Sequence, residues 1–388
     1  MYTKLIGLGA GGNKAAICAV KNQVIEMSNV MLVNSTLKDI PKDYDGLAVE
    51  FANSYGGCGK ERKMSYELCK NSIMDGTIPL EDFLHIGQDD QAELVVIASS
   101  TEGGTGSGST PLLAKYIREV LGVSVHVFLF TGFEEDVRGA KNTVEVFQEL
   151  QNNFAVEALK LKKYLPECND NKIKAEEKAD IDFCKKLSVL SGLQLRDSDH
   201  NIDPTDLLKI STTDGYMVIE SAIIEEKIKN RDQFRKIIID MIDNSKALDI
   251  DEPTQTRLAV IINIRKDSTD YIDYNDILTE RFGQCYDKFE HIQDESDMEQ
   301  FVAFISAGSK MPMNEVEDVY NKYKDMTTRV NKDTDAFFGT IKQKSFADED
   351  SAFDIGSQKK NKAVTNKANF FSNIEKEKKA KEDSINEF

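Results

Sequence analysis

The stretch of sequence that decides the fold is Gly-Gly-Thr-Gly-Ser-Gly-Ser-Thr-Pro, at residues 103–111. It follows an apolar run at residues 94–98 and precedes an amphipathic segment that begins at Leu112. The run predicts a buried strand and the segment predicts a helix, so the stretch between them predicts a connecting loop. Glycines let a backbone approach an anion closely, and the start of a helix attracts negative charge. The stretch is therefore typical of a phosphate-binding loop.

A second glycine-rich stretch, Gly-Leu-Gly-Ala-Gly-Gly-Asn at residues 7–13, follows a predicted strand at residues 4–8. Its spacing matches the GxGxxG fingerprint, which makes an NAD-binding oxidoreductase an alternative hypothesis. That fingerprint requires an acidic residue at the end of the second strand, where this chain has Asn-Ser-Thr at residues 34–36. The loop at residues 103–108 carries no lysine and so differs from the GxxxxGK[ST] loop. Two phosphate-type loops on one sheet favour a nucleoside triphosphate as ligand.

The chain has 388 residues and a formal net charge of −18. This length predicts two domains and a tail. The negative charge argues against direct, non-specific wrapping of nucleic acid, and we also expect no direct sequence-specific nucleic-acid binding. The sequence shows no apolar run long enough to cross a bilayer and no secretory signal, so we expect a cytoplasmic protein without a membrane partner.

The first half of the chain alternates strand-like and helix-like segments, which is typical of an α/β fold with a mostly parallel sheet and helices on both faces. The predicted strands are residues 4–8, 30–33, 94–98 and 124–130. A long charged helix is predicted at about residues 175–193. The second half predicts a smaller α+β domain, with one or two helices at residues 219–242 and strands at residues 257–264 and 301–306.

These patterns divide the chain into four parts. We expect a nucleotide-binding domain at residues 1–172, a central helix and linker at 173–200, the smaller α+β domain at 201–330, and a helix end with a tail at 331–388. Residues 345–388 are rich in Lys, Glu, Asn and Ser, which predicts a disordered tail with a helical tendency near residues 375–383. The Phe370–Phe371 pair and the lysines around it suit a short binding motif.

Cysteines and histidines give no sign of metal or nucleophilic chemistry. No CxxC pair or metal-type spacing occurs, so we expect reduced thiols and no protein-ligated metal. His126 lies inside a predicted strand, where a structural role is the simpler explanation. The six cysteines are Cys18, Cys58, Cys69, Cys168, Cys184 and Cys285.

The loop at residues 103–108 resembles the signature loop of the tubulin/FtsZ superfamily, although Glu102 stands where FtsZ usually has another glycine. Residues 9–13 resemble the first nucleotide loop of that superfamily. Residues 56–63 resemble a glycine-rich loop near the γ-phosphate in its TubZ branch. The resemblance implies binding of GTP or GDP by Gly9, Ala10, Gly11, Gly12, Asn13, Gly57, Cys58, Gly59, Lys60, Gly103, Gly104, Thr105, Gly106, Ser107 and Gly108.

The segment after the strand at residues 124–130 also resembles the superfamily. The resemblance implies that Glu134 holds the ribose hydroxyls and that Arg138 lies near the phosphates. An acid-rich helix start explains the same residues without a ligand.

The start of the long helix is where the superfamily places its contacts to the base. The resemblance implies an asparagine there, either Asn169 or Asn171, and a carboxylate from Asp182. A carboxylate accepting from N1–H and N2–H₂ would select guanine. A solvated residue beside Lys178 and Lys185 is the ordinary alternative for Asp182.

Asn-Ile-Asp-Pro-Thr-Asp at residues 201–206 resembles the NxDxxD motif of the superfamily. A turn with a helix cap explains this sequence equally well, and the two roles are compatible. The resemblance implies that subunits stack head to tail. Asp203 and Asp206 of one subunit would then act as catalytic residues, polarising water and supporting Mg²⁺ at the γ-phosphate bound by the next.

The resemblance thus implies a filament-forming GTPase. By resemblance to the TubZ branch, it would position plasmid or phage DNA through a DNA-bound adaptor that contacts the C-terminal tail. An FtsZ-like division protein and a non-hydrolysing scaffold are further alternatives. The presence of both Asp203 and Asp206 argues against the scaffold.

Overall fold

The structure is a computed structural model that describes residues 1–54, 56–151, 153–195, 201–296, 299–322, 367 and 370–374. Residues 1–320 form one compact unit, and residues 321–388 form a second one. In the second unit the rings of Phe370 and Phe371 pack edge to face, 5.2 Å apart. Most of the predicted tail, including the helical tendency at residues 375–383, lies outside the described residues.

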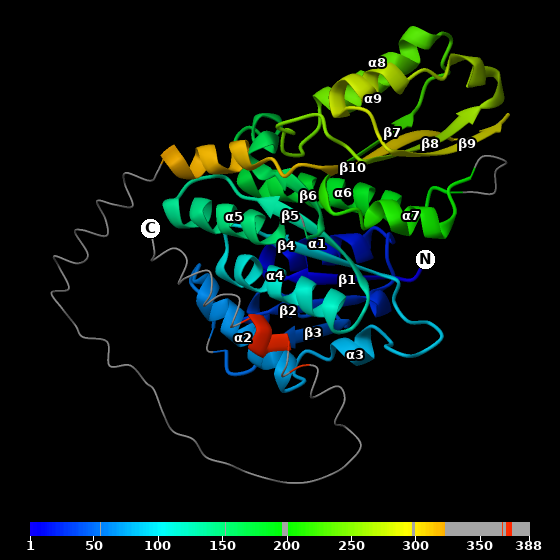
Figure 1. Cartoon of the computed structure of the whole chain (residues 1–388). Helices are drawn as coiled ribbons and strands as arrows, with labels where there is room; N and C mark the ends of the chain where they lie inside the picture. Colours follow the sequence, from blue (N-terminus) through cyan, green and yellow to red (C-terminus); the bar gives the residue numbers. More distant parts are fainter. Residues whose placement is uncertain are drawn as a thin grey trace, which may run out of the picture. The chain divides into compact units, whose positions relative to one another are not determined.

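Six parallel strands make up the first part of a ten-stranded sheet, in the order β3-β2-β1-β4-β5-β6 (Figure 1). The predictions of four of these strands and of a mostly parallel sheet are confirmed. Apolar runs form the central strands because both faces of the sheet are covered. The bounds are β1 (Thr3–Leu8), β2 (Val30–Asn34), β3 (Leu47–Glu50), β4 (Leu94–Ser100), β5 (Ser124–Thr131) and β6 (Ala155–Lys160).

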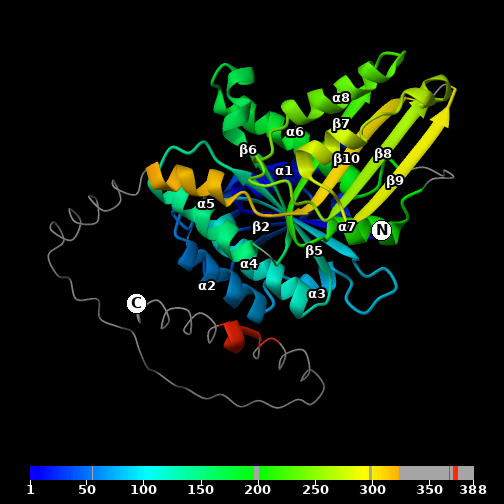
Figure 2. The ribbon, with the colours of Figure 1, turned by 45° about the horizontal axis from the view of Figure 1, so that its top comes forward.

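Helices cover both faces of this parallel part, as predicted. Figure 2 shows α2 (Arg62–Met74), α4 (Gly104–Glu119) and α5 (Val137–Leu150) side by side on one face. On the other face α1 (Gly9–Lys21) packs against α6 (Lys172–Leu190). The core beneath α6 includes Phe128 and Phe183, whose ring centroids lie 4.7 Å apart.

The remaining strands continue the same sheet. The first of them, β7 (Gly215–Ile224), pairs in parallel with β6 over two residues and antiparallel with β10 (Gln300–Ser309). Next come β8 (Arg257–Arg265), antiparallel to β10, and β9 (Asp287–Glu295), parallel to β8. The other helices are α3 (Leu80–Phe83), α7 (Pro204–Ser211), α8 (Arg231–Asp243) and α9 (Asn275–Phe282). Short 3₁₀ turns lie at Met27–Asn29, Leu37–Asp39, Leu161–Tyr164, Pro166–Cys168 and Lys266–Tyr271.

The helix prediction at residues 219–242 was partly wrong. It holds only from Arg231 onward, because residues 219–224 belong to β7. Ile219 pairs with Ile305 of β10, so a strand 86 positions away in the sequence decides its conformation. The predicted long helix and the strands at residues 257–264 and 301–306 are confirmed as α6, β8 and β10.

The predicted domain boundaries stay a prediction, because one sheet runs through both predicted domains. Within the described part of the chain, the helices are either too short or too polar to cross a bilayer.

Candidate functional site

The carboxyl ends of the parallel strands collect the glycine-rich segments at one edge of the sheet. The strand order reverses between β1 and β4, whose following helices α1 and α4 begin at Gly9 and Gly104. Open α/β sheets bind ligands at such a reversal, outside the carboxyl ends of the strands. We call this region the glycine edge: residues 9–13, 34–36, 56–61, 101–108 and 132–138.

The glycine-rich stretches are less loop-like than the sequence predicted. Residues 104–108 already form the first turns of α4, and residues 9–13 form those of α1, so the loop after β4 shrinks to residues 101–103. Glycine in a helix costs about 1 kcal/mol relative to alanine, which favours the loop prediction. Tight packing outweighs this propensity here.

Close approach of the backbones explains two of these glycines. A Cβ on Gly12 would lie 2.8 Å from the carbonyl carbon of Ala98, and one on Gly106 would lie 2.6 Å from the carbonyl oxygen of Ser100. Both neighbours are backbone atoms of β4, which cannot move aside. The helix starts of α1 and α4 are therefore held directly against the strand ends.

The two helix starts also meet each other. A Cβ on Gly9 would lie 3.1 Å from the amide nitrogen of Gly106. The hydroxyl of Ser35, at the end of β2, is hydrogen-bonded to that of Thr105 at 2.9 Å. Two sets of helix-start N–H groups thus point outward from one small area, which is the arrangement that binds phosphate.

Asn13 is a buried polar residue at this edge. Its side chain is 3% exposed, and neither Oδ1 nor Nδ2 has a hydrogen-bond partner among the described residues. Burying an unpaired amide is unfavourable by about 1–3 kcal/mol, so such a group usually has a ligand or water.

The segment at residues 58–61 lies over the start of α4. A Cβ on Gly104 would lie 2.8 Å from the amide nitrogen of Glu61. Lys60 in this segment forms an ion pair with Asp136, the N-cap of α5. Lys60 therefore places a positive charge beside the start of α4, whose glycine-rich residues 104–108 include no lysine. Cys58 is buried, whereas Gly57 and Gly59 have open space around them.

Arg138 also reaches this segment. Its guanidinium lies 2.8 Å from the carboxylate of Glu61 and donates to the carbonyl oxygen of Gly59 at 3.4 Å. The structure therefore brings Arg138 to residues 59–61, and its phosphate role stays a prediction.

Arg62 was missed by the sequence analysis. Pro111 lies inside α4 and has no N–H to donate to the carbonyl oxygen of Ser107, one turn earlier. Arg62 fills this gap, with Nη2 3.0 Å from that oxygen, and also pairs with Glu145 and Glu149 of α5. The proline inside an otherwise helical segment was the signal that a distant donor is needed.

Glu134 is already engaged in the structure. Its carboxylate pairs with Lys160 at 2.7 Å and Lys162 at 2.8 Å. Burial acts to raise the pKa of Glu134, but the two lysines outweigh it and lower the pKa. Its backbone N–H donates to Glu102, whose own pKa is raised by burial. The ribose role of Glu134 stays a prediction.

The residues expected at the base divide into two groups. Asn171 caps α6 by accepting from Lys174, whereas Asn169 adopts a left-handed backbone conformation just before the cap. Asp182 accepts from the Tyr164 hydroxyl at 2.9 Å and pairs with Lys185 at 2.8 Å. These contacts suit the ordinary explanation for Asp182, and its guanine role stays a prediction.

Asp180 lies two positions before Asp182, on the part of α6 that faces α1. Burial, together with the nearby Cys18, raises the pKa of its carboxyl to about 8. Lys14 of α1 acts on the same carboxyl, so Asp180 belongs to the contact between α1 and α6. Hydrophobic periodicity alone did not distinguish Asp180 from Asp182.

The acidic loop, residues 201–206, lies at the start of α7. The Asp203 side chain accepts from the backbone N–H of Asp206 at 2.8 Å, so the capping role is present. Ile202 and Leu207 are both 2% exposed and fasten the loop to the core. Asp203 is left exposed and Asp206 partly exposed, which makes both carboxylates available to a neighbouring molecule.

The acidic loop and the glycine edge lie at opposite edges of the parallel strands. At the end of α7, the Ser211 carbonyl is bonded to His126 near the beginning of β5, and the next strand starts beside Phe154, just before β6. Figure 1 shows α7 on the side of the N-terminus, where β1 begins. The two regions are joined by α6, whose 19 residues span about 28 Å.

Solved structures with the same arrangement are known. TubZ of Bacillus thuringiensis serovar israelensis, as a protofilament in its GTPγS form, aligns with a TM-score of 0.65 and 14% identity over 87% of this chain and 94% of that one. CetZ2 of Haloferax volcanii, a GTPγS-bound protofilament, aligns with 0.65 and 15% over 84% and 100%. The empty FtsZ dimer of M. jannaschii aligns with 0.60 and 18% over 79% and 88%.

The chain has the tubulin/FtsZ fold. No protein-family model and no curated protein matches it in sequence. The resemblance of the glycine-rich loops to this superfamily is therefore confirmed at the level of fold.

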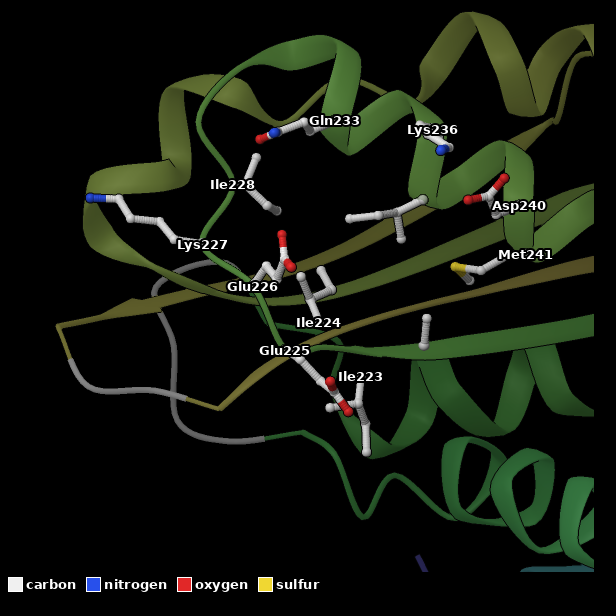
Figure 3. Close-up of a pocket in the computed structure, with 12 residues that line it drawn as sticks. Ile223, Ile224, Glu225, Glu226, Lys227, Ile228, Gln233, Lys236, Asp240 and Met241 are labelled. Atoms are coloured by element: carbon white, nitrogen blue, oxygen red, sulfur yellow. The ribbon is translucent and has the colours of Figure 1, made fainter.

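A groove of about 550 Å³ lies between the end of β7 and α8, apart from the glycine edge and the acidic loop (Figure 3). Apolar side chains such as Ile224 and Met241 line it together with charged ones such as Glu226 and Lys236. None of the site residues predicted from the sequence is among its described lining residues.

Proposed function

We propose that this protein is a GTPase that assembles head to tail and hydrolyses GTP at the junction between subunits. The observation that carries the proposal is the placement of the glycine edge and the acidic loop at opposite edges of one sheet. A subunit with this layout cannot complete its own site, whereas two stacked subunits can. Such a contact does not close on itself and generates a filament.

The glycine edge supplies the nucleotide-binding half. Helix starts at Gly9 and Gly104 would receive phosphate, the Asn13 amide would gain a partner, and Lys60 and Arg138 would supply positive charge. Guanine nucleotide is supported by the GTPγS forms of the similar TubZ and CetZ2 structures. We propose Asp182, together with Asn169 or Asn171, as the residues to test for guanine recognition.

Each carboxylate among the described residues of the glycine edge already has a partner. Glu102 accepts from the Glu134 N–H, Glu61 pairs with Arg138, and Asp136 pairs with Lys60 while capping α5. The side chains of Glu134 and Glu135 pair with lysines. Asp203 and Asp206 of the adjacent subunit would supply the carboxylates that orient water at the γ-phosphate.

Mg²⁺ fits the same junction. Among the described residues no group of three or more His, Cys, Asp or Glu side chains could hold a metal ion within one subunit. Phosphate oxygens with the carboxylates of Asp203 and Asp206 would give the oxygen ligands that Mg²⁺ prefers. When bound there, Mg²⁺ would neutralise charge on the phosphates.

We further propose that the filament positions plasmid or phage DNA through a DNA-bound adaptor held by the C-terminal tail. The support is the resemblance of residues 56–63 to the TubZ branch and the similarity of the fold to TubZ. A pull-down with the intact chain and with a chain ending at residue 330 would test whether an adaptor requires the tail.

Electron microscopy with GTP, GDP and a slowly hydrolysed analogue tests the assembly directly. We expect filaments with GTP and the analogue, and GTP turnover that rises steeply with protein concentration. The absence of polymer under every condition would overturn the proposal.

Asp206→Ala separates hydrolysis from assembly. We expect normal GTP binding, persistent filaments and hydrolysis slowed by about 100-fold or more, because the variant removes the water-orienting carboxylate. Asp203→Asn is the matched variant, since asparagine preserves the helix cap while removing the charge. Wild-type hydrolysis by Asp206→Ala would refute the catalytic assignment.

A further inference from the structure

Helices α1 and α6 pack along a stripe of paired side chains. The Lys14 ammonium lies 2.8 Å from the Glu176 carboxylate. Cys18 lies four residues after Lys14, and Cys184 lies eight residues after Glu176, so each cysteine shares a helix face with its ion-pair residue. The packing that brings the ion pair together therefore also brings the two cysteines together.

The two thiols are in direct contact. The Cys18 and Cys184 side chains are hydrogen-bonded to each other, and the Asn22 amide nitrogen lies 3.3 Å from the Cys18 sulfur. Cys184 is 5% exposed, whereas Cys18 is partly exposed. The Cys18 thiol is thus accessible to a small reagent, whereas the Cys184 thiol is buried next to it.

The neighbouring groups also favour the thiolate form of Cys18. The hydrogen bond from Cys184 lowers the pKa of Cys18 to about 7 against the opposing effect of burial, with help from Asn22 and Lys21. The carboxyl of Asp180 faces the pair from α6. A thiolate is the reactive form of cysteine, so Cys18 is the nucleophile of the pair.

Cys69 provides the internal contrast. It is fully buried, and burial raises the pKa of its thiol to about 12. It therefore has neither the access nor the thiolate character of Cys18.

We propose that Cys18 and Cys184 form an oxidative modification site, at which a peroxide joins α1 to α6 by an intramolecular disulfide. The Cys18 thiolate attacks one peroxide oxygen and breaks the O–O bond, giving a sulfenic acid and hydroxide, which takes up a proton. The Cys184 sulfur then attacks the Cys18 sulfur, and the sulfenic oxygen leaves as water with the Cys184 proton. Two thiols are oxidised and one peroxide is reduced to two waters.

A disulfide between Cys18 and Cys184 would link two helices that extend from different functional regions. Helix α1 begins at the glycine edge, and α6 runs from Asn171 toward the acidic loop. The disulfide would fix these two helices against each other. This modification goes beyond the proposed GTPase function, and its formation does not depend on nucleotide or assembly.

Peptide mapping of the intact, reduced protein tests the proposal. After hydrogen peroxide at a low molar excess and rapid thiol blocking, we expect a crosslinked peptide pair containing Cys18 and Cys184, and a loss of two of the six thiols. Reduction should restore both. Because this test uses the wild-type chain, it does not depend on a variant folding.

Three variants make the test specific. Cys18→Ser and Cys184→Ala should each abolish the crosslink, whereas Cys285→Ser should retain it. In a separate alkylation assay Cys18 should react at least about 10-fold faster than Cys69. Oxidation that yields only sulfinic acid at Cys18, another cysteine pairing, or no thiol loss would overturn the proposal.

Discussion

The glycine edge and the acidic loop are built in opposite ways. At the glycine edge the backbone itself is the functional element, and Gly12 and Gly106 allow two helix starts to press against β4. At the acidic loop the backbone is fastened by buried Ile202 and Leu207, and side chains carry the charge outward. The first region offers N–H donors and the second offers carboxylates. Each region therefore lacks what the other supplies, and we infer that they meet between molecules.

Placing a negative charge at the glycine edge should have the largest effect. Gly103 is the N-cap of α4, has an ordinary backbone conformation, and has room for a side chain. Gly103→Asp should keep the helix capped while repelling phosphate, and so weaken GTP binding by about 100-fold or more. Nucleotide titration measures this. Gly103→Asn caps without charge and should bind much more tightly than Gly103→Asp.

Mixing two inactive variants tests the comparison itself. Gly103→Asp should retain the acidic loop, and Asp206→Ala should retain the glycine edge. If the site is shared between subunits, their mixture should recover part of the GTP turnover that neither shows alone. Turnover that stays at the level of the separate variants would place both halves of the site within one subunit.

Filling the contact between α1 and β4 should damage folding. A Cβ on Gly12 overlaps the backbone of Ala98, so Gly12→Ala should lower the free energy of unfolding by about 3 kcal/mol. Urea unfolding measures the change. Gly57→Ala is the control, because a Cβ there meets no described atom within 4 Å. Equal stability of the two variants would contradict the tight-packing explanation.

Acid should lower the stability of the folded protein through protonation of His126. Burial lowers the pKa of this histidine from 6.5 to about 4 in the folded state. The unfolded chain therefore binds the proton first, and stability falls as the pH drops from about 6.5 toward 4. The loss should be about 2 kcal/mol at pH 5.

Urea unfolding at pH 7 and pH 5 checks this. His126→Gln should remove that part of the pH dependence, whereas His85→Gln, at a histidine paired with Asp90 on the surface, should leave it in place. An unchanged pH dependence in His126→Gln would contradict the assignment.

The smallest expected effect is at Lys60. Lys60→Ala should weaken GTP binding by about 10-fold, because it removes one cation beside the start of α4. Its exposed pair with Asp136 contributes at most about 1 kcal/mol to folding, so stability should change little. Lys63→Ala, at an exposed lysine at the start of α2, should leave binding unchanged. Equal affinities for the two variants would argue against Lys60 as a phosphate contact.

Strong local patterns made much of the fold predictable. The apolar runs of β2 and β4 are continuous, and those of β1 and β5 are interrupted only by Gly7 and His126. The weaker strands were missed for local reasons. β3 is a short edge strand, and β6 carries a buried Glu157 whose partner, Lys186, comes from α6. Long-range pairing made residues 219–224 a strand.

The site was predictable where a motif acts through its own backbone. Asp203 caps α7 as its sequence suggests, and Gly106 is required by its contact with Ser100 within one strand–helix unit. Side-chain roles were harder, because Glu134 and Asp182 already have partners from other elements.

The sequence by itself determined the strands β1, β2, β4 and β5, the positions of the two glycine-rich segments and the acidic loop, because these follow from short-range periodicity, turn chemistry and capping. Only the tertiary structure decided which distant segments lie next to each other. It places the glycine edge and the acidic loop at opposite edges of the sheet. It also brings Arg62 to the carbonyl oxygen left without a donor by Pro111, and the Cys18 thiol into hydrogen-bond contact with that of Cys184. The physical reason is that these contacts depend on how distant segments pack, and packing is set by the whole sheet.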